Sequence, residues 1–197
     1  SFGVGILHAI YGDRIGKMRL AEEATQIQMD LGYPIGLQDQ YVAALGGVNV
    51  YRVFKDGAIA IEPLKGKIEG LTLFFTGFKR DANEVLRNST TNGLEQVQEV
   101  AWESKEALER GDYYRYGELM NEHWEAKKKR GGMSNEQIDH WYSLALENGA
   151  VGGKLVGAGG GGFLLFYTED KDRLIKVMPL KHIPFKWDYI GSRVVGG

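Results

Sequence analysis

The chain has 197 residues, of which 43% are hydrophobic and 25% are charged, and its formal net charge is −2. This composition is typical of a globular protein with a substantial core, and it predicts neither a nucleic-acid partner nor a membrane partner. The chain has no cysteine, which excludes disulfides and thiolate metal sites. Its apolar runs fall far short of the roughly 20 residues that cross a bilayer, and it opens without a cationic, apolar signal segment. We therefore expect a cytoplasmic protein.

The first residues form an unusual start for a chain. Residues 1–11, Ser-Phe-Gly-Val-Gly-Ile-Leu-His-Ala-Ile-Tyr, have no methionine and lead directly into an apolar, helical pattern. Natural termini usually fray through polar residues. We therefore expect this sequence to be cut from a longer protein.

Hydrophobic spacing predicts helices and one hairpin in the first part of the chain. Helices are expected over residues 2–11, 16–31 and 40–45. In the second of them, four apolar residues recur on one helical face, namely Leu20, Ala24, Ile27 and Leu31. Two apolar runs, at residues 48–54 and 58–61, flank an Asp56-Gly57 turn and are typical of a β-hairpin.

The second part of the chain mixes strands and helices. The predicted elements are a strand over residues 71–76, helices over 82–110, 113–129 and 134–149, two strands around a glycine run, a helix over 171–177 and a last strand over 185–189. This order, β-α-α-α-β-β-α-β, indicates an α+β domain with two layers.

The glycine run at residues 157–162, Gly-Ala-Gly-Gly-Gly-Gly, lies between two apolar segments. Glycine adopts positive φ without steric cost, and successive bare N–H groups can converge on an anion. A flexible linker would be polar and rich in serine, unlike this loop. An ordinary structural turn and an anion-binding or substrate-binding loop both remain open at this point.

Asp39 precedes a short predicted helix, in Pro34-Ile-Gly-Leu-Gln-Asp-Gln40. An aspartate at such a place often caps the helix. It can also accept or orient the proton of a substrate hydroxyl. The two roles are compatible.

Several charged residues have a structural and a functional interpretation. Arg80 follows a predicted strand, either as a solvated side chain or as an anion clamp. Lys127 belongs to a basic helix end that solvent would ordinarily cover. The acidic residues Glu22, Glu23 and Asp30 are expected to form a solvated helix face, with a metal site as the alternative.

The two motifs together resemble those of the GHMP kinases. Residues 152–162, Gly-Gly-Lys-Leu-Val-Gly-Ala-Gly-Gly-Gly-Gly, are similar to the third signature motif of that superfamily, and the Pro34–Gln40 segment resembles the one that supplies a catalytic aspartate in its sugar-kinase branch. Further stretches are similar to the heptose 7-phosphate kinases and, next to them, the fucokinases; these are residues 73–80, 123–129, 148–167 and 185–193. The resemblance covers essentially the whole chain.

The resemblance implies a fold and a reaction. Residues 1–67 would be the second half of an N-terminal domain like ribosomal protein S5 domain 2, and residues 68–197 a ferredoxin-like GHMP kinase C-terminal domain. The reaction would transfer the γ-phosphoryl group of ATP, with Mg²⁺ as the ion, to a hydroxyl of a sugar such as a heptose phosphate. Association into a homo-oligomer is a further expectation.

The resemblance also implies roles for individual residues. Asp39 would be catalytic, and the expected substrate-binding or phosphate-binding residues are Gly36, Gln38, Arg80, Lys127, Gly157, Ala158, Gly159, Gly160 and Gly161. The superfamily tends to place a magnesium-binding glutamate where this chain has Gln28, so Asp30 or Glu23 would have to replace it. Neutral glutamine is a weaker ligand for a hard cation.

Two motifs of the superfamily are missing from this sequence. The first motif and most of the second, a loop that wraps the ATP phosphates, have no counterpart here. We therefore expect the 197 residues alone to lack kinase activity. The alternative to a sugar kinase is a non-catalytic, sugar-phosphate-binding or oligomerising remnant.

Overall fold

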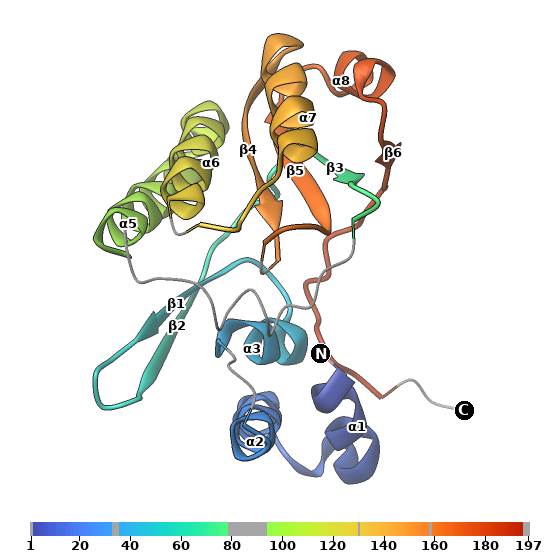
Figure 1. Ribbon diagram of the computed structural model, residues 1–197. Coiled ribbons are helices and arrows are strands. Elements are labelled where there is room, and N and C mark those ends of the chain that lie inside the picture. The colour runs from blue at the N-terminus through green and yellow to red at the C-terminus, as the bar shows by residue number, and fades with distance from the viewer. Residues whose placement is uncertain (1, 33–35, 79–93, 130, 158, 195–197) are drawn as a thin grey trace. The chain divides into compact units, whose positions relative to one another are not determined.

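The computed structural model describes residues 2–32, 36–78, 94–129, 131–157 and 159–194 (Figure 1). The chain forms two compact units, one of Ser1–Lys65 with Lys186–Gly197 and one of Gly66–Phe185. The predicted domains divide the chain once, between residues 67 and 68, and this division stays a prediction. In the compact units, the C-terminal segment belongs with the N-terminal part of the chain.

The first unit is built from helices and a hairpin. Its described elements are α1 (Phe2–Tyr11), the 3₁₀ helix η1 (Gly12–Arg14), α2 (Lys17–Asp30), α3 (Gln38–Leu45), β1 (Asn49–Val53) and β2 (Ile59–Pro63). The two strands pair antiparallel, with Tyr51 opposite Ile61. The predicted helices and hairpin are confirmed, and α3 begins at Gln38 rather than at residue 40.

A small apolar core joins the three helices of the first unit. Its buried members are Val4, Leu7, Leu20, Ala21, Ala24, Tyr41 and Ala44. On α2 the prediction is correct for Leu20 and Ala24 but wrong for Ile27 and Leu31, which are 46% and 67% exposed. The buried stripe runs through positions 20, 21, 24 and 25, and at helical spacing it continues to position 28 rather than 27.

The C-terminal segment docks on the end of α3. The Ser192 N–H donates to the Ala43 and Ala44 carbonyls at 2.9 and 3.2 Å, and the Gly47 N–H donates to the Asp188 carbonyl at 2.7 Å. The Ser192 hydroxyl also lies 2.6 Å from Nδ1 of the buried His8. These contacts satisfy carbonyls that a helix end leaves without a partner.

This docking shows that the strand predicted over residues 185–189 is wrong. The strand in this region is β6 (Lys181–His182), and the chain leaves the sheet after the Ile183 N–H, which donates to the Leu73 carbonyl at 2.8 Å. Pro184 has no N–H to donate to a ladder, and beyond it the backbone bonds to the first unit instead.

The second unit contains an antiparallel sheet and helices. In its described part the strand order is β4-β5-β3-β6, with β3 (Leu71–Phe75), β4 (Ala150–Val156) and β5 (Phe163–Thr168) preceding β6 in the chain. The helices are α5 (Leu94–Arg110), α6 (Tyr113–Lys128), α7 (Glu136–Glu147) and α8 (Lys171–Val177). The predicted order of these elements is confirmed, although residues 82–93 of the first predicted helix lie outside the described residues.

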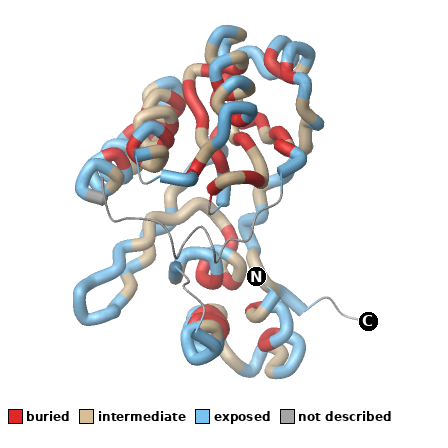
Figure 2. Tube along the Cα trace, in the orientation of Figure 1, coloured by how far each residue is buried: buried red, intermediate tan, exposed pale blue. Residues whose placement is uncertain are grey.

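The core of the second unit lies between its sheet and helices. Buried residues gather on β4, β5, α6 and α7 (Figure 2). The largest fully buried side chains are Trp124, Phe74 and Phe166. Tyr142 of α7 joins them, and its hydroxyl bonds to the Gly153 backbone of β4 and to Asn121 of α6. Burial raises the pKa of Tyr142, so this hydroxyl is neutral and ties helix to strand. Within the described ranges, no helix combines the length and the apolar character that crossing a membrane requires.

Candidate active site

Asp39 lies in the first turn of α3, where its side chain is exposed. The residue before the helix is Leu37, which has no side-chain capping bond. The N-cap interpretation of Asp39 is therefore wrong, because α3 starts earlier than the sequence predicted. A carboxylate in the first turn is stabilised by the helix macrodipole while remaining open to a ligand. The structure thus leaves the proton-accepting role available to Asp39.

Gln38 precedes Asp39 directly, and its side chain lies close to Gly36. A β-carbon on Gly36 would lie 2.5 Å from Oε1 of Gln38. The Gln38 side chain therefore folds back over the position where Gly36 has none. All three predicted residues of this segment lie together at the start of α3.

A pair of glutamines lies behind this segment. Gln40, the residue after Asp39, is only 3% exposed, and its side-chain amide is 2.5 Å from that of Gln28 on α2. Sequence analysis noted Gln28 only as an unusual metal ligand and did not single out Gln40. The available signal was the spacing of Gln40 with Ala44, four residues apart, on the buried face of α3.

The candidate metal ligands do not form a site in the described part of the first unit. Glu23 accepts a hydrogen bond from Arg19 at 3.0 Å, and Asp30 accepts one from Gln26 at 2.7 Å. Seven positions separate the two carboxylates on α2, or about 10 Å along a helix, so they remain separate, alternative candidates. No cluster of three or more potential metal ligands occurs among the described residues, and the identity of a magnesium ligand stays a prediction.

The glycine loop connects β4 to β5 and has an unusual backbone. Gly157, Gly159, Gly160 and Gly162 have φ of +103°, +121°, +72° and +103°. These values are strained for L-residues with side chains, which explains why the sequence uses glycine here.

Part of this loop bonds to the protein itself. The Gly160 N–H donates to the Met133 carbonyl at 2.8 Å, and the Gly162 N–H donates to the Phe78 carbonyl at 3.0 Å. These two N–H groups hold the loop in place and do not point to a ligand in this conformation. A loop whose successive amides all face an anion is therefore not what this conformation shows. Because the Gly160 and Gly162 amides are already bonded, the role of binding an anion is left to the other amides of the loop.

Lys127 of α6 reaches the same loop. Its half-buried side chain donates from Nζ to the Gly157 carbonyl at 2.6 Å. Lys127 therefore combines a place at the basic end of the helix with a contact to the glycine loop. An ammonium group placed at a glycine loop is suited to a phosphate, and its role in binding one stays a prediction.

The structure assembles the predicted residues as two sets. Gly36, Gln38 and Asp39 lie together in the first unit, and Lys127 lies with Gly157 and residues 159–161 in the second. Arg80 and Ala158, which were also predicted, lie outside the described residues.

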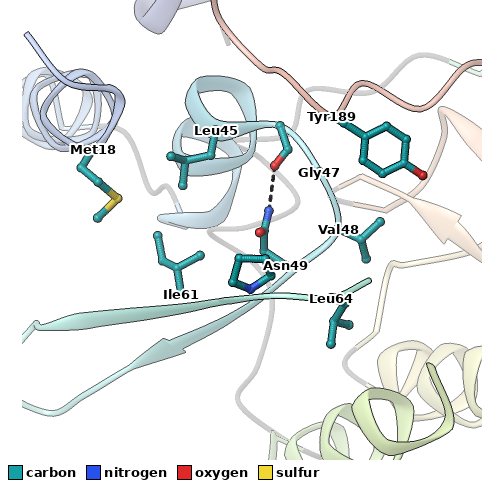
Figure 3. Close-up of a pocket in the computed structure, with 10 residues that line it drawn as sticks. Met18, Leu45, Gly47, Val48, Asn49, Ile61, Leu64 and Tyr189 are labelled. Carbon is teal, nitrogen blue, oxygen red and sulfur yellow. Dashed lines mark hydrogen bonds between the residues drawn. The ribbon is translucent and has the colours of Figure 1, made fainter. Parts of the chain in front are cut away.

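An apolar pocket in the first unit was not anticipated from the sequence (Figure 3). It has a volume of about 450 Å³ and is lined by Met18, Leu45, Gly46, Gly47, Val48, Asn49, Ile61, Pro63, Leu64 and Tyr189. At its wall, Nδ2 of Asn49 donates to the Gly46 carbonyl at 2.8 Å. None of the predicted site residues lines this pocket.

Comparison with known proteins identifies the class to which this fold and these motifs belong. Residues 104–179 match the family described as GHMP kinases C terminal. This range runs from the last part of α5 to just beyond α8 and includes the glycine loop. The chain contains a GHMP kinase C-terminal domain. The resemblance seen in the sequence and the α+β fold class are both confirmed.

Particular sugar kinases are similar to the chain. It is 31% identical over 183 residues to D-glycero-alpha-D-manno-heptose 7-phosphate kinase of Campylobacter jejuni, in an alignment that covers 83% of this chain and 54% of that kinase. The crystal structure of a D-glycero-D-manno-heptose 1-phosphate kinase from Bacteroides thetaiotaomicron superposes with a TM-score of 0.69 and 26% identity, over 96% of this chain and 60% of that one.

More distant relatives share the fold. Lactococcus lactis galactokinase, solved with galactose, has a TM-score of 0.69 at 15% identity, over 96% of this chain and 63% of that one. The chain thus spans about half to three fifths of the length of these relatives.

Proposed function

We propose that the protein is a sugar kinase that transfers the γ-phosphoryl group of ATP to a hydroxyl group of a heptose phosphate. The observation that carries this proposal is the exposed Asp39 in the first turn of α3, within a chain 31% identical to a heptose 7-phosphate kinase. Sugar kinases of this superfamily use ATP, typically with Mg²⁺. The magnesium ligand stays a prediction, and the roles below concern the protein's own groups.

Asp39 would accept or orient the proton of the sugar hydroxyl that attacks the phosphoryl group. A carboxylate is suited to this role when it is held in place and open to the substrate. The place of Asp39 in the first turn of α3 and its exposure support this role.

The glycine loop and Lys127 would bind phosphate oxygens. Phosphoryl transfer depends largely on positioning and on stabilisation of negative charge. The Gly160 and Gly162 bonds fix the shape of the loop, and the bond between Lys127 and Gly157 places a positive charge beside it.

Replacement of Asp39 by asparagine tests this proposal. In the full-length protein, we expect Asp39→Asn to lower kcat by at least about 100-fold, because that is the lower range of a general base's contribution. The free energy of unfolding should change little. Asp172→Asn is a matched control, since Asp172 is also an exposed acid in the first turn of a helix, α8.

The assay measures ATP-dependent phosphorylation of heptose 7-phosphate, heptose 1-phosphate, fucose and galactose. Turnover near that of the unmodified protein in Asp39→Asn would refute the assignment. Binding of a sugar phosphate by calorimetry without turnover on any acceptor would identify a non-catalytic binding protein instead.

A further inference from the structure

The side-chain amide of Gln40 is buried directly behind the catalytic candidate. Gln40 is 3% exposed, whereas its neighbour Asp39 is exposed. A buried amide is costly unless its N–H and C=O groups have partners. Three groups surround it, namely the amide of Gln28 at 2.5 Å and the backbone carbonyls of Gly36 and Leu37.

The Gln40 amide satisfies all three neighbours in one orientation, provided that the Gln28 amide is turned over as well, because Gln28 Oε1 is the atom 2.5 Å away. If its oxygen faces the carbonyls of Gly36 and Leu37, acceptors meet acceptors and the buried group is poorly matched. If the amide is turned over, Nε2 donates to both carbonyls at 3.1 Å, and the Gln40 oxygen faces Gln28. Since that oxygen can only accept, Gln28 must present its NH₂ group to it.

The result is a directed chain of hydrogen bonds from α2 to the turn before Asp39. In this arrangement the Gln40 NH₂ donates to the carbonyls of Gly36 and Leu37. The Gln28 amide, whose Oε1 is the atom 2.5 Å from Gln40, is then also turned over so that its NH₂ donates to the Gln40 oxygen. We propose that Gln28 is a positioning residue for Asp39, and that it acts as a hydrogen-bond donor rather than as a substitute metal ligand. The catalytic part of this inference rests on the proposed function of Asp39.

Two substitutions of Gln28 distinguish a hydrogen-bond donor from a metal ligand at this position. Gln28→Glu removes the donor, and Gln28→Lys keeps one. Gln28→Glu is nearly isosteric, but its carboxylate has no donor and would face the Gln40 oxygen. Gln40 must then turn over and lose its bonds to Gly36 and Leu37. Gln28→Lys keeps a donor and removes any metal-binding oxygen.

We therefore expect kcat to fall about tenfold in Gln28→Glu, the scale of one or two lost hydrogen bonds, and to change less than about threefold in Gln28→Lys. KM for the sugar should change less than kcat, because the substituted group does not touch substrate. Gln98→Glu and Gln98→Lys, at an exposed position on α5, control for the change in net charge. If Gln28→Lys unfolds at lower denaturant, Gln28→His is a second variant that keeps a donor.

A measurement that needs no catalysis tests the network separately. Exchange of the Gln40 Nε2 protons, followed by NMR, should be slow in the unmodified protein and in Gln28→Lys, and faster in Gln28→Glu. Unchanged exchange in Gln28→Glu would overturn the network. Turnover that is retained in Gln28→Glu and lost in Gln28→Lys would show that a carboxylate serves at position 28, and would overturn the inference. Normal turnover in Asp39→Asn would refute the proposed function but leave the exchange result as a test of the network.

Discussion

Gly191 lies where the C-terminal segment meets the end of α3, and its replacement by alanine should release that segment. Gly191 has a φ of +71°. A β-carbon there would lie 2.5 Å from both the Ala44 carbonyl oxygen and the Gly46 nitrogen. Both atoms belong to the backbone, so neither can move aside as the end of a flexible side chain could.

The expected cost follows from two separate effects. An L-residue in the left-handed region costs about 1–2 kcal/mol. Relief of the clash requires the backbone to separate, which breaks the Ser192 bond to Ala43 and the Gly47 bond to Asp188, at about 1 kcal/mol each. The two effects together cost about 3–4 kcal/mol. The loss of stability cannot exceed the free energy with which the C-terminal segment docks.

Amide hydrogen exchange measures this release at individual residues. Protection of the Ser192 and Gly47 amides should fall in Gly191→Ala, while that of the β3 and β5 amides stays the same. Gly12→Ala is the matched control, because Gly12 has a φ of +59° but a β-carbon there would meet no atom within 4 Å. If the two variants lose equal stability and Ser192 stays protected, the close approach at Gly191 does not matter and the reasoning is refuted.

Two further predictions concern the glycine loop and the pH dependence of docking. Gly159→Ala should weaken sugar-phosphate binding, measured by calorimetry, more than Gly157→Ala does. A β-carbon at Gly159 would lie 2.7 Å from Sδ of Met133, whereas one at Gly157 would meet no atom within 4 Å. Equal losses of affinity in the two variants would contradict this prediction. Two backbone N–H groups of the C-terminal segment lower the pKa of the exposed Asp188. The stability that the Asp188 carboxylate adds to docking should therefore be complete at neutral pH. It should be lost as the pH falls below about 3.9, the ordinary pKa of an aspartate, and through the lower pKa of Asp188 in the folded protein. Protection of the Ser192 amide should show this loss, and Asp188→Asn should remove that pH dependence.

Local patterns predicted most of the elements correctly. The Asp56-Gly57 turn between two apolar runs predicted the β1–β2 hairpin, and apolar spacing predicted α1 and α2. Such features depend on neighbouring residues, whose preferences are visible in sequence. The boundary of α3 was less accurate, and this small error changed the interpretation of Asp39 from a cap to an exposed carboxylate in the first turn.

The sequence motifs located both sets of candidate site residues. They did not show which hydrogen bonds the atoms of those residues make. Glycine content predicted a loop at residues 157–162 with positive φ, as observed at four of its glycines. It could not show that the Gly160 and Gly162 amides bond to Met133 and Phe78, because those partners are far away in the sequence. Likewise, Gln28 looked like a weak metal ligand until Gln40 was found against it.

The sequence by itself determined the α+β class, the order of most elements, the resemblance to GHMP kinases and the place of the glycine loop. Only the tertiary structure decided where the C-terminal segment docks, which loop amides are occupied and that the Gln40 amide lies against Gln28. The reason is physical: these features depend on contacts between distant residues, such as His8 and Ser192, which are 184 positions apart. Local propensity and periodicity carry no information about such pairs, since their energies exist only once the chain has folded.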